Sequence, residues 1–169
     1  ESGDRLFQAE APFKASEPVR VVLLSLNSQY VHSSLAPWCL AAGLERYAAP
    51  GFETRVLEGT VNETPEAVLG RIEAAAPQLL GISCAIWNIK FIAGLLPEIR
   101  AALPGCDIVL GGPEVSHRAQ GALKSYPQAD LLIAGEGELP FARLLDALRG
   151  LIPPDEVPGL CYRLGAGFV

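Results

Sequence analysis

Several sequence patterns that indicate a specific chemistry are absent from this 169-residue chain. Its four cysteines form no C-x-x-C pair, so the usual zinc and iron–sulfur ligand patterns are missing. Neither the G-x-G-x-x-G dinucleotide fingerprint nor the G-x-x-x-x-G-K-S/T phosphate loop occurs, and no G-x-S-x-G elbow is present. The two histidines, His32 and His117, are too far apart for an H-x-x-x-H metal pair. We therefore expect no metal ligands and no catalytic residues within this chain.

Basic residues and long apolar runs are also scarce. The chain has 13 Lys and Arg against 19 Asp and Glu, a net charge of −6, which argues against nucleic-acid and anionic-lipid partners. Pro77 and Gly81 interrupt the best candidate for a membrane span, and no signal peptide opens the chain. Methionine is missing altogether, which predicts a fragment or a processed chain. We expect a cytoplasmic protein with free, mostly buried cysteines.

What the chain does contain is a regular alternation of apolar runs and helical periodicity. Val19 to Leu26 is a continuous Val- and Leu-rich run, typical of a strand buried on both faces of a parallel sheet. Glu53 to Glu58 is shorter and more polar, as an edge strand should be. The sequence Thr64-Pro65-Glu66 is typical of a helix start. Further strands are expected at 79–84, 107–110 and 130–134, and further helices at 35–49, 88–103, 116–126 and 139–148.

Five strand–helix units predict a three-layer α/β/α domain with a flavodoxin-like, doubly wound, five-stranded parallel sheet. The order 2-1-3-4-5 places the second and fifth strands at the edges. Residues 1–18 are polar and aperiodic, and we interpret them as a disordered tail or a cloning remnant. The domain itself spans 19–150. Residues 151–169 contain two short strand-like segments, at 157–163 and 167–169, which predict a hairpin or linker.

Ligands of open parallel sheets bind beyond the carboxyl ends of the strands, where the winding reverses. The four loops expected there, 27–34, 84–88, 111–116 and 135–138, hold most of the unusual residues. The loop 27–34 is long and rich in hydrogen-bonding side chains, which favours a binding role, although a helix-capping role is the alternative. Ser83 in an apolar strand must bond to main chain or to a ligand.

The other loops carry glycines and one aromatic residue. Trp87 offers a flat apolar face that could cover a planar cofactor or pack under the next helix. The pair Gly111-Gly112 indicates either close approach of a ligand or a tight turn. Glu136 and Glu138 could bond to ligand amides or cap the following helix.

Four segments together resemble the cobalamin-binding domains that precede radical S-adenosylmethionine domains. They are LLSLNSQYVHSSLAPWCLA, GISCAIWN, VLGGPEVS and IAGEGELPF, and the resemblance covers about Arg20 to Arg163. The family group includes the oxidative cyclase of magnesium-protoporphyrin monomethyl ester. The resemblance implies cobalamin as cofactor, with its corrin over the carboxyl ends of the strands and its nucleotide tail in a slot beside strands three and four. The ending VPGLCYR resembles the lead into a C-terminal radical domain, which would hold S-adenosylmethionine and a 4Fe–4S cluster.

The resemblance also implies roles for individual residues. Ser83 matches a serine near the tail, Gly111 and Gly112 match a glycine pair that gives the tail room, and the 135–137 loop borders the tail or the corrin. The D-x-H-x-x-G motif of methionine-synthase-like cobalamin domains is not kept, as in many members from radical enzymes: Asn27 and Gln29 stand near its positions, and His32 falls three residues late. The lower cobalt face would then be open or filled by Gln29, Tyr30 or water. The expected cofactor-binding residues are Asn27, Gln29, Tyr30, Ser83, Cys84, Trp87, Gly111, Gly112, Pro113, Gly135, Glu136 and Gly137.

The resemblance implies a binding module that is not catalytic alone and that serves methyl transfer or another radical reaction in an intact enzyme. Two alternatives stay open. The fold could persist as a scaffold or interaction domain with an empty pocket, which the absent histidine favours and Ser83, Gly111 and Gly112 oppose. A flavin or another small ligand is a third reading, although the loop with Gln29 and Tyr30 is a poor phosphate cradle.

Overall fold

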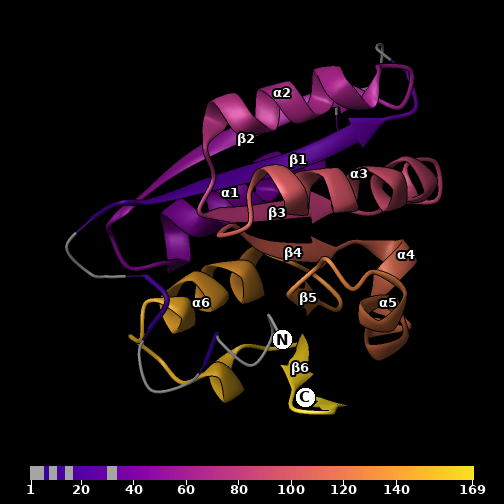
Figure 1. Ribbon diagram of the computed structural model, residues 1–169. Coiled ribbons are helices and arrows are strands. Elements are labelled where there is room, and N and C mark those ends of the chain that lie inside the picture. Colours follow the sequence, from indigo (N-terminus) through magenta and orange to yellow (C-terminus); the bar gives the residue numbers. More distant parts are fainter. Residues whose placement is uncertain (1–5, 8–10, 14–16, 30–33) are drawn as a thin grey trace.

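A central sheet organises the computed structural model, which describes residues 6–7, 11–13, 17–29 and 34–169. In these residues seven strands follow one another in the order β2-β1-β3-β4-β5-β6-β7 (Figure 1). The first five are parallel neighbours, in the order predicted from the sequence. Their bounds are β1 Val19–Asn27, β2 Phe52–Thr60, β3 Leu79–Ser83, β4 Asp107–Gly111 and β5 Leu131–Ile133.

The fifth strand is not at the edge of the sheet. The strand β6 (Leu160–Leu164) pairs antiparallel with β5, and β7 (Gly167–Phe168) pairs antiparallel with β6. The expectation of five strands with β5 at an edge is therefore wrong. The physical reason is that all three residues of β5 are apolar, and an exposed apolar edge strand would leave unpaired main-chain groups beside an aggregation-prone surface. The segment expected as a hairpin supplies that partner and lengthens the sheet.

Helices cover both faces of the sheet. The helices α1 (Leu35–Tyr47) and α6 (Glu138–Leu148) pack on the face that carries Val21 and Leu23. The helices α2 (Pro65–Ala75), α3 (Ile89–Ala102) and α5 (Ala119–Ser125) pack on the opposite face, with Val22 and Leu24. Because successive side chains of β1 enter different cores, six of its nine residues are apolar.

The two helices on the first face approach each other closely. A Cβ atom on Gly43 of α1 would lie 2.6 Å from the main-chain oxygen of Glu138, at the start of α6. Any other residue at this position would push the helices apart. Gly43 therefore sets the spacing of α1 and α6 over the carboxyl ends of the central strands.

The described residues near the amino terminus differ from the tail that we expected. Leu6 and Phe13 are buried in the same core cluster as α6. The main-chain N–H of Phe13 donates to the carbonyl of Leu148 at 3.3 Å, and the Phe7 ring lies 4.8 Å from the ring of Tyr162. At these positions the chain is packed against the domain.

The expected helix at 116–126 is two shorter ones. The helix α4 (Pro113–Ser116) is a single turn, and α5 begins at Ala119. Between them Arg118 leaves helical geometry, with φ −135° and ψ 44°. Among the residues that the structure describes, no helix has the length and apolarity to cross a membrane.

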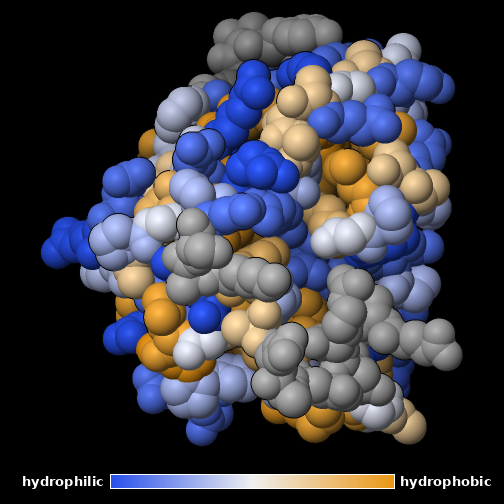
Figure 2. Space-filling view, turned by 60° about the vertical axis from the view of Figure 1, so that its left-hand side comes forward, coloured by the Kyte–Doolittle hydropathy of each residue, from blue (hydrophilic) through white to orange (hydrophobic). Residues whose placement is uncertain are grey.

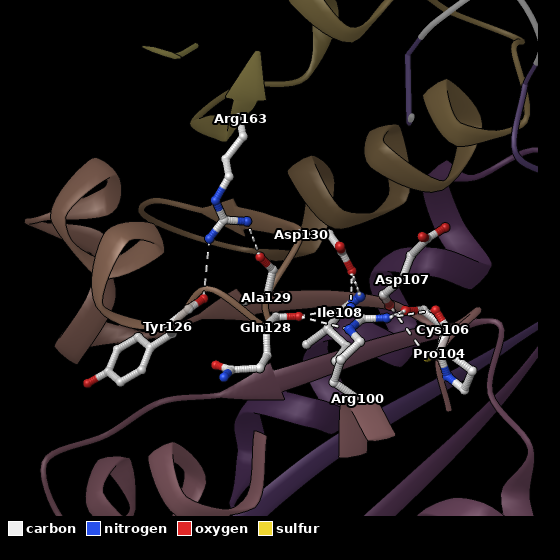
Figure 3. A network of polar contacts seen from close by, with 10 residues as sticks. All are labelled: Arg100, Pro104, Cys106, Asp107, Ile108, Tyr126, Gln128, Ala129, Asp130 and Arg163. Carbon is white, nitrogen blue, oxygen red and sulfur yellow. Dashed lines mark hydrogen bonds and ion pairs between the residues drawn. The ribbon is translucent and has the colours of Figure 1, made fainter. Parts of the chain in front are cut away.

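Buried charges fix the amino ends of β4 and β5 (Figure 3). Arg100, in the last turns of α3, donates to a carboxylate oxygen of Asp130 at 2.5 Å and to the carbonyl of Cys106 at 2.7 Å. The same oxygen of Asp130 accepts the N–H of Ile108 at 2.8 Å. Arg163 of β6 donates to the carbonyls of Ala129, at 2.5 Å, and Leu123. This network ties α3, the central strands and β6 together at the end of the sheet opposite the candidate site.

Candidate cofactor-binding site

A cavity of about 150 Å³ opens beside the carboxyl ends of β3, β4 and β5, and the starts of α1 and α6 border it. We call it the slot. Most of its surface is apolar, and a cavity of about this volume lined by apolar side chains holds one benzene-sized ring. The slot therefore suits a flat aromatic group. It is lined by Ala36, Leu40, Gly81, Ile82, Ser83, Val109, Leu110, Gly111, Gly112, Ile133, Gly135, Gly137, Glu138 and Phe141.

The two glycines at the end of β4 differ in what surrounds them. A Cβ on Gly111 would meet one neighbour within 4 Å, the main-chain oxygen of Ile133 at 3.7 Å, so this glycine leaves room in the slot. Gly112 has φ 102°, and a Cβ there would overlap the carbonyl oxygen of Cys84. Gly111 thus leaves the slot open, whereas Gly112 is required by the turn itself.

The end of β3 brings Ser83 and Cys84 to different places. Ser83 lines the slot. Cys84 is buried in the core on the opposite face, and its N–H donates to the carbonyl of Gly111 at 2.7 Å. Burial raises the pKa of the Cys84 thiol to about 12, so it stays protonated at neutral pH. The geometry favours Ser83 as a ligand contact and gives Cys84 a structural position.

Trp87 is held at the top of the β3 loop with half of its side chain exposed. Its indole N–H donates to the carbonyl of Leu26 at 3.1 Å. The buried Asn88 donates to the same carbonyl and to that of Ser83, both at 3.0 Å, and accepts the N–H of Ala85 at 2.8 Å. Asn88 thus joins the ends of β1 and β3, and the Trp87 indole shares the Leu26 carbonyl with it. Sequence reasoning missed Asn88, although an asparagine before a helix is a signal for a cap or turn.

Large apolar side chains are exposed where the chain leaves the strands. They lie at the start of α1, in the loop after β3 and at the start of α6, and they are Leu35, Trp38, Ile86, Trp87 and Leu139. Several large exposed apolar residues at one end of a domain mark a binding surface. The side that Figure 2 brings forward, where the strands begin, shows hydrophilic residues interspersed with hydrophobic ones.

The loop after β5 borders the slot through Gly135 and Gly137. The exposed Glu136 does not line the slot; it lies beside a shallow groove of about 680 Å³ that also contacts Pro158 and Gly159. The N–H of Gly135 donates to the hydroxyl of Ser116 at 3.3 Å, a contact that the sequence did not predict.

The remaining predicted residues are placed less centrally. Asn27 ends β1, is buried, and accepts the N–H of Val61 at 3.0 Å through its carbonyl. Gln29 is exposed just beyond it, and Pro113 is exposed at the start of α4. Tyr30, together with His32, lies outside the described residues.

Ionisable side chains give no sign of a metal site. In the described part of the chain, no group of three or more His, Cys, Asp or Glu side chains is placed to hold a metal ion. All four cysteines, Cys39, Cys84, Cys106 and Cys161, are free thiols, as expected. The slot and the exposed apolar side chains together define a candidate binding site.

Comparison with known families identifies the domain. Residues 21–145 match the family model described as the B12 binding domain. The chain belongs to this family. The match begins within β1 and ends within α6, so it includes every strand and loop that forms the slot. The resemblance inferred from the sequence, and cobalamin as the cofactor of the family, are thereby confirmed.

This B12-binding domain matches part of the sequence of longer methyltransferases. It is 31% identical over 132 residues to 2-(S-pantetheinyl)-carbapenam-3-carboxylate methyltransferase of Streptantibioticus cattleyicolor, covering 75% of this chain and 19% of that protein. It is 35% identical over 91 residues to the cobalamin-dependent radical SAM methyltransferase TokK of Streptomyces tokunonensis, covering 53% of this chain and 13% of TokK. The chain thus spans less than a fifth of the length of these curated relatives.

A solved structure shows the same fold. The radical S-adenosylmethionine methyltransferase TsrM of Kitasatospora setae, described with cobalamin and a 4Fe–4S cluster bound, superposes with a TM-score of 0.71 at 22% identity. The likeness covers 90% of this chain and 28% of TsrM. The α/β architecture with a parallel core is therefore shared.

Proposed function

We propose that this domain holds cobalamin for a multidomain radical S-adenosylmethionine enzyme, with the nucleotide tail in the slot and the corrin against the Trp87 loop. The slot carries the proposal. It lies beside β3 and β4, where the resemblance places the tail, and its apolar lining suits the aromatic base of that tail. The open space at Gly111 adds room that any side chain would occupy.

The polar and apolar side chains at this site match the polar and apolar parts of cobalamin. Ser83 offers the slot a hydroxyl beside an otherwise mainly apolar wall. Trp87 and Ile86 present exposed apolar surface suited to a large planar ring. When bound, cobalamin supplies a cobalt ion that can carry a methyl group, which agrees with the methyltransferase relatives. The chain's own residues bind and orient the cofactor and exclude water from its tail.

The reaction itself belongs to a further domain in this proposal. That domain lies C-terminal to this one and brings S-adenosylmethionine and the 4Fe–4S cluster, and the chain contributes no catalytic side chain. Burial raises the pKa of the Cys84 and Cys106 thiols to about 12, so neither is suited to act as a nucleophile. An acidic chain with free cysteines suits the cytoplasm and does not suit nucleic-acid or membrane partners.

The test is an absorbance titration with hydroxocobalamin, followed by desalting. We expect a shifted cobalamin spectrum that stays with the protein, with a Kd below about 10 μM. No retention at tens of micromolar contradicts the proposal and favours a scaffold domain that keeps the fold without the cofactor. Riboflavin 5′-phosphate under the same conditions tests the flavin alternative, and we expect no retention.

A further inference from the structure

One hydroxyl group joins the two glycine-containing loops that border the slot. Ser116, the last residue of α4, donates its hydroxyl proton to the carbonyl of Gly112 at 2.7 Å. The same oxygen accepts the main-chain N–H of Gly135 at 3.3 Å. Gly112 and Gly135 both line the slot, whereas Ser116 does not. Ser116 therefore does not contact the slot, but it bonds to two residues that line it, Gly112 and Gly135.

The loop on the Ser116 side is firmly held. Cys84 donates its N–H to Gly111 at 2.7 Å, and Glu114 donates its N–H to the carbonyl of Cys84 at 3.3 Å. Val115, next to Ser116, is fully buried. Ser116 thus belongs to a fixed turn that is continuous with β3 and β4.

The loop on the Gly135 side is held differently. A Cβ on Gly135 would meet no atom within 4 Å, so the space on that side of the residue is open. The N–H of Ala134 donates to the carbonyl of Gly159 at 2.8 Å. The N–H of Phe141 donates to the carbonyl of Gly137 at the start of α6. Between these two anchors, the bond from Gly135 to Ser116 connects the loop to the β4 turn.

We propose that Ser116 is a positioning residue that sets the width of the slot and thereby favours corrinoids with a nucleotide tail over corrinoids without one. The inference rests on the proposed function. A serine near a helix end often bonds to a preceding carbonyl, as Ser116 does to Gly112. Accepting a bond from a second loop is the additional feature, and it requires an oxygen at this position.

The experiment compares two ligands on three proteins. Hydroxocobalamin carries the nucleotide tail and cobinamide lacks it, and the Kd of each is measured for the unaltered chain, Ser116→Ala and Ser116→Thr. We expect Ser116→Ala to weaken hydroxocobalamin binding about fivefold to tenfold, because one bridging hydrogen-bond system is lost. Cobinamide binding should change by less than about twofold, and Ser116→Thr, which keeps the hydroxyl, should stay within about twofold for both ligands.

The outcomes separate positioning from general stability. Equal weakening of both ligands, or no change in Ser116→Ala, overturns the role of Ser116. Failure of the unaltered chain to bind either ligand refutes the proposed function together with it. Unfolding of Ser116→Ala is checked by circular dichroism; the pair Ser116→Val and Ser116→Thr then makes the same comparison at equal side-chain shape.

Discussion

Gly112 lies directly against the main chain of Cys84, so that a Cβ on Gly112 would overlap the carbonyl oxygen of Cys84. The neighbouring Gly111 accepts the N–H of Cys84 at 2.7 Å. These contacts lock the loops after β3 and β4 together at the mouth of the slot. They also separate two adjacent glycines that look equivalent in the sequence.

Gly112→Ala is expected to destabilise the whole domain. The substitution forces an alanine into φ 102° and into the carbonyl of Cys84, which should lower the free energy of unfolding by about 2 kcal/mol or more. Gly111→Ala is the matched control, because its Cβ has ordinary contacts, and it should cost less than about 1 kcal/mol. Urea denaturation followed by circular dichroism measures both. Equal losses for the two variants would show that the close approach at Gly112 is relieved by small shifts.

Gly111→Leu is expected to block cobalamin without unfolding the domain. The new side chain would enter the slot from a position without backbone strain, and we expect hydroxocobalamin affinity to fall at least about tenfold. Gly94→Leu is the control, since Gly94 is exposed on α3 over the opposite face and a Cβ there meets nothing within 4 Å. Absorbance titration of both variants decides the matter. Full affinity in Gly111→Leu would place the tail elsewhere.

The order of the first five strands was predictable because buried parallel strands leave long apolar runs in the sequence. Val19 to Leu26 is apolar at most positions because its side chains enter two cores. The partner of β5 was not predictable in the same way. Pairing of Leu131 with Tyr162 joins residues far apart in the chain, and no local pattern encodes such a contact.

The sequence predicted where the candidate site lies, but it did not predict what each residue contributes there. Strand ends place Ser83 and Gly111 at one edge, so the slot follows from topology. The contributions of Asn88 and Ser116 depend on hydrogen bonds across loops, at 3.0 Å to Leu26 and 3.3 Å from Gly135. Such bonds exist only once the fold has brought the loops together, so composition alone did not distinguish these polar residues from others.

Asn88→Ala is expected to loosen the Trp87 loop and destabilise the domain. Asn88 is buried and makes three side-chain hydrogen bonds, so its removal leaves the N–H of Ala85 without that partner. We expect a loss of about 2–3 kcal/mol in the free energy of unfolding. In a Trp38→Phe background Trp87 is the sole tryptophan, and its emission should shift to longer wavelength as the indole becomes more solvated. An unchanged emission maximum would show that Leu26 holds the ring without help from Asn88.

Stability should fall as the pH rises from about 9 towards 12, because Cys84, Cys106 and Cys161 are buried as neutral thiols and burial raises the pKa of each. Burial raises the pKa values of Cys84 and Cys106 to about 12, whereas thiols in the unfolded chain titrate near 9. Between these values the unfolded chain loses protons that the folded chain retains, so deprotonation favours unfolding. Each of these two thiols should lower the free energy of unfolding by about 1.4 kcal/mol per pH unit in this window, with no effect below about pH 8. Urea denaturation at pH 8, 9 and 10 measures the slope. Cys106→Ala should have a shallower slope than the unaltered chain, and equal slopes would show that Cys106 does not contribute to the alkaline loss.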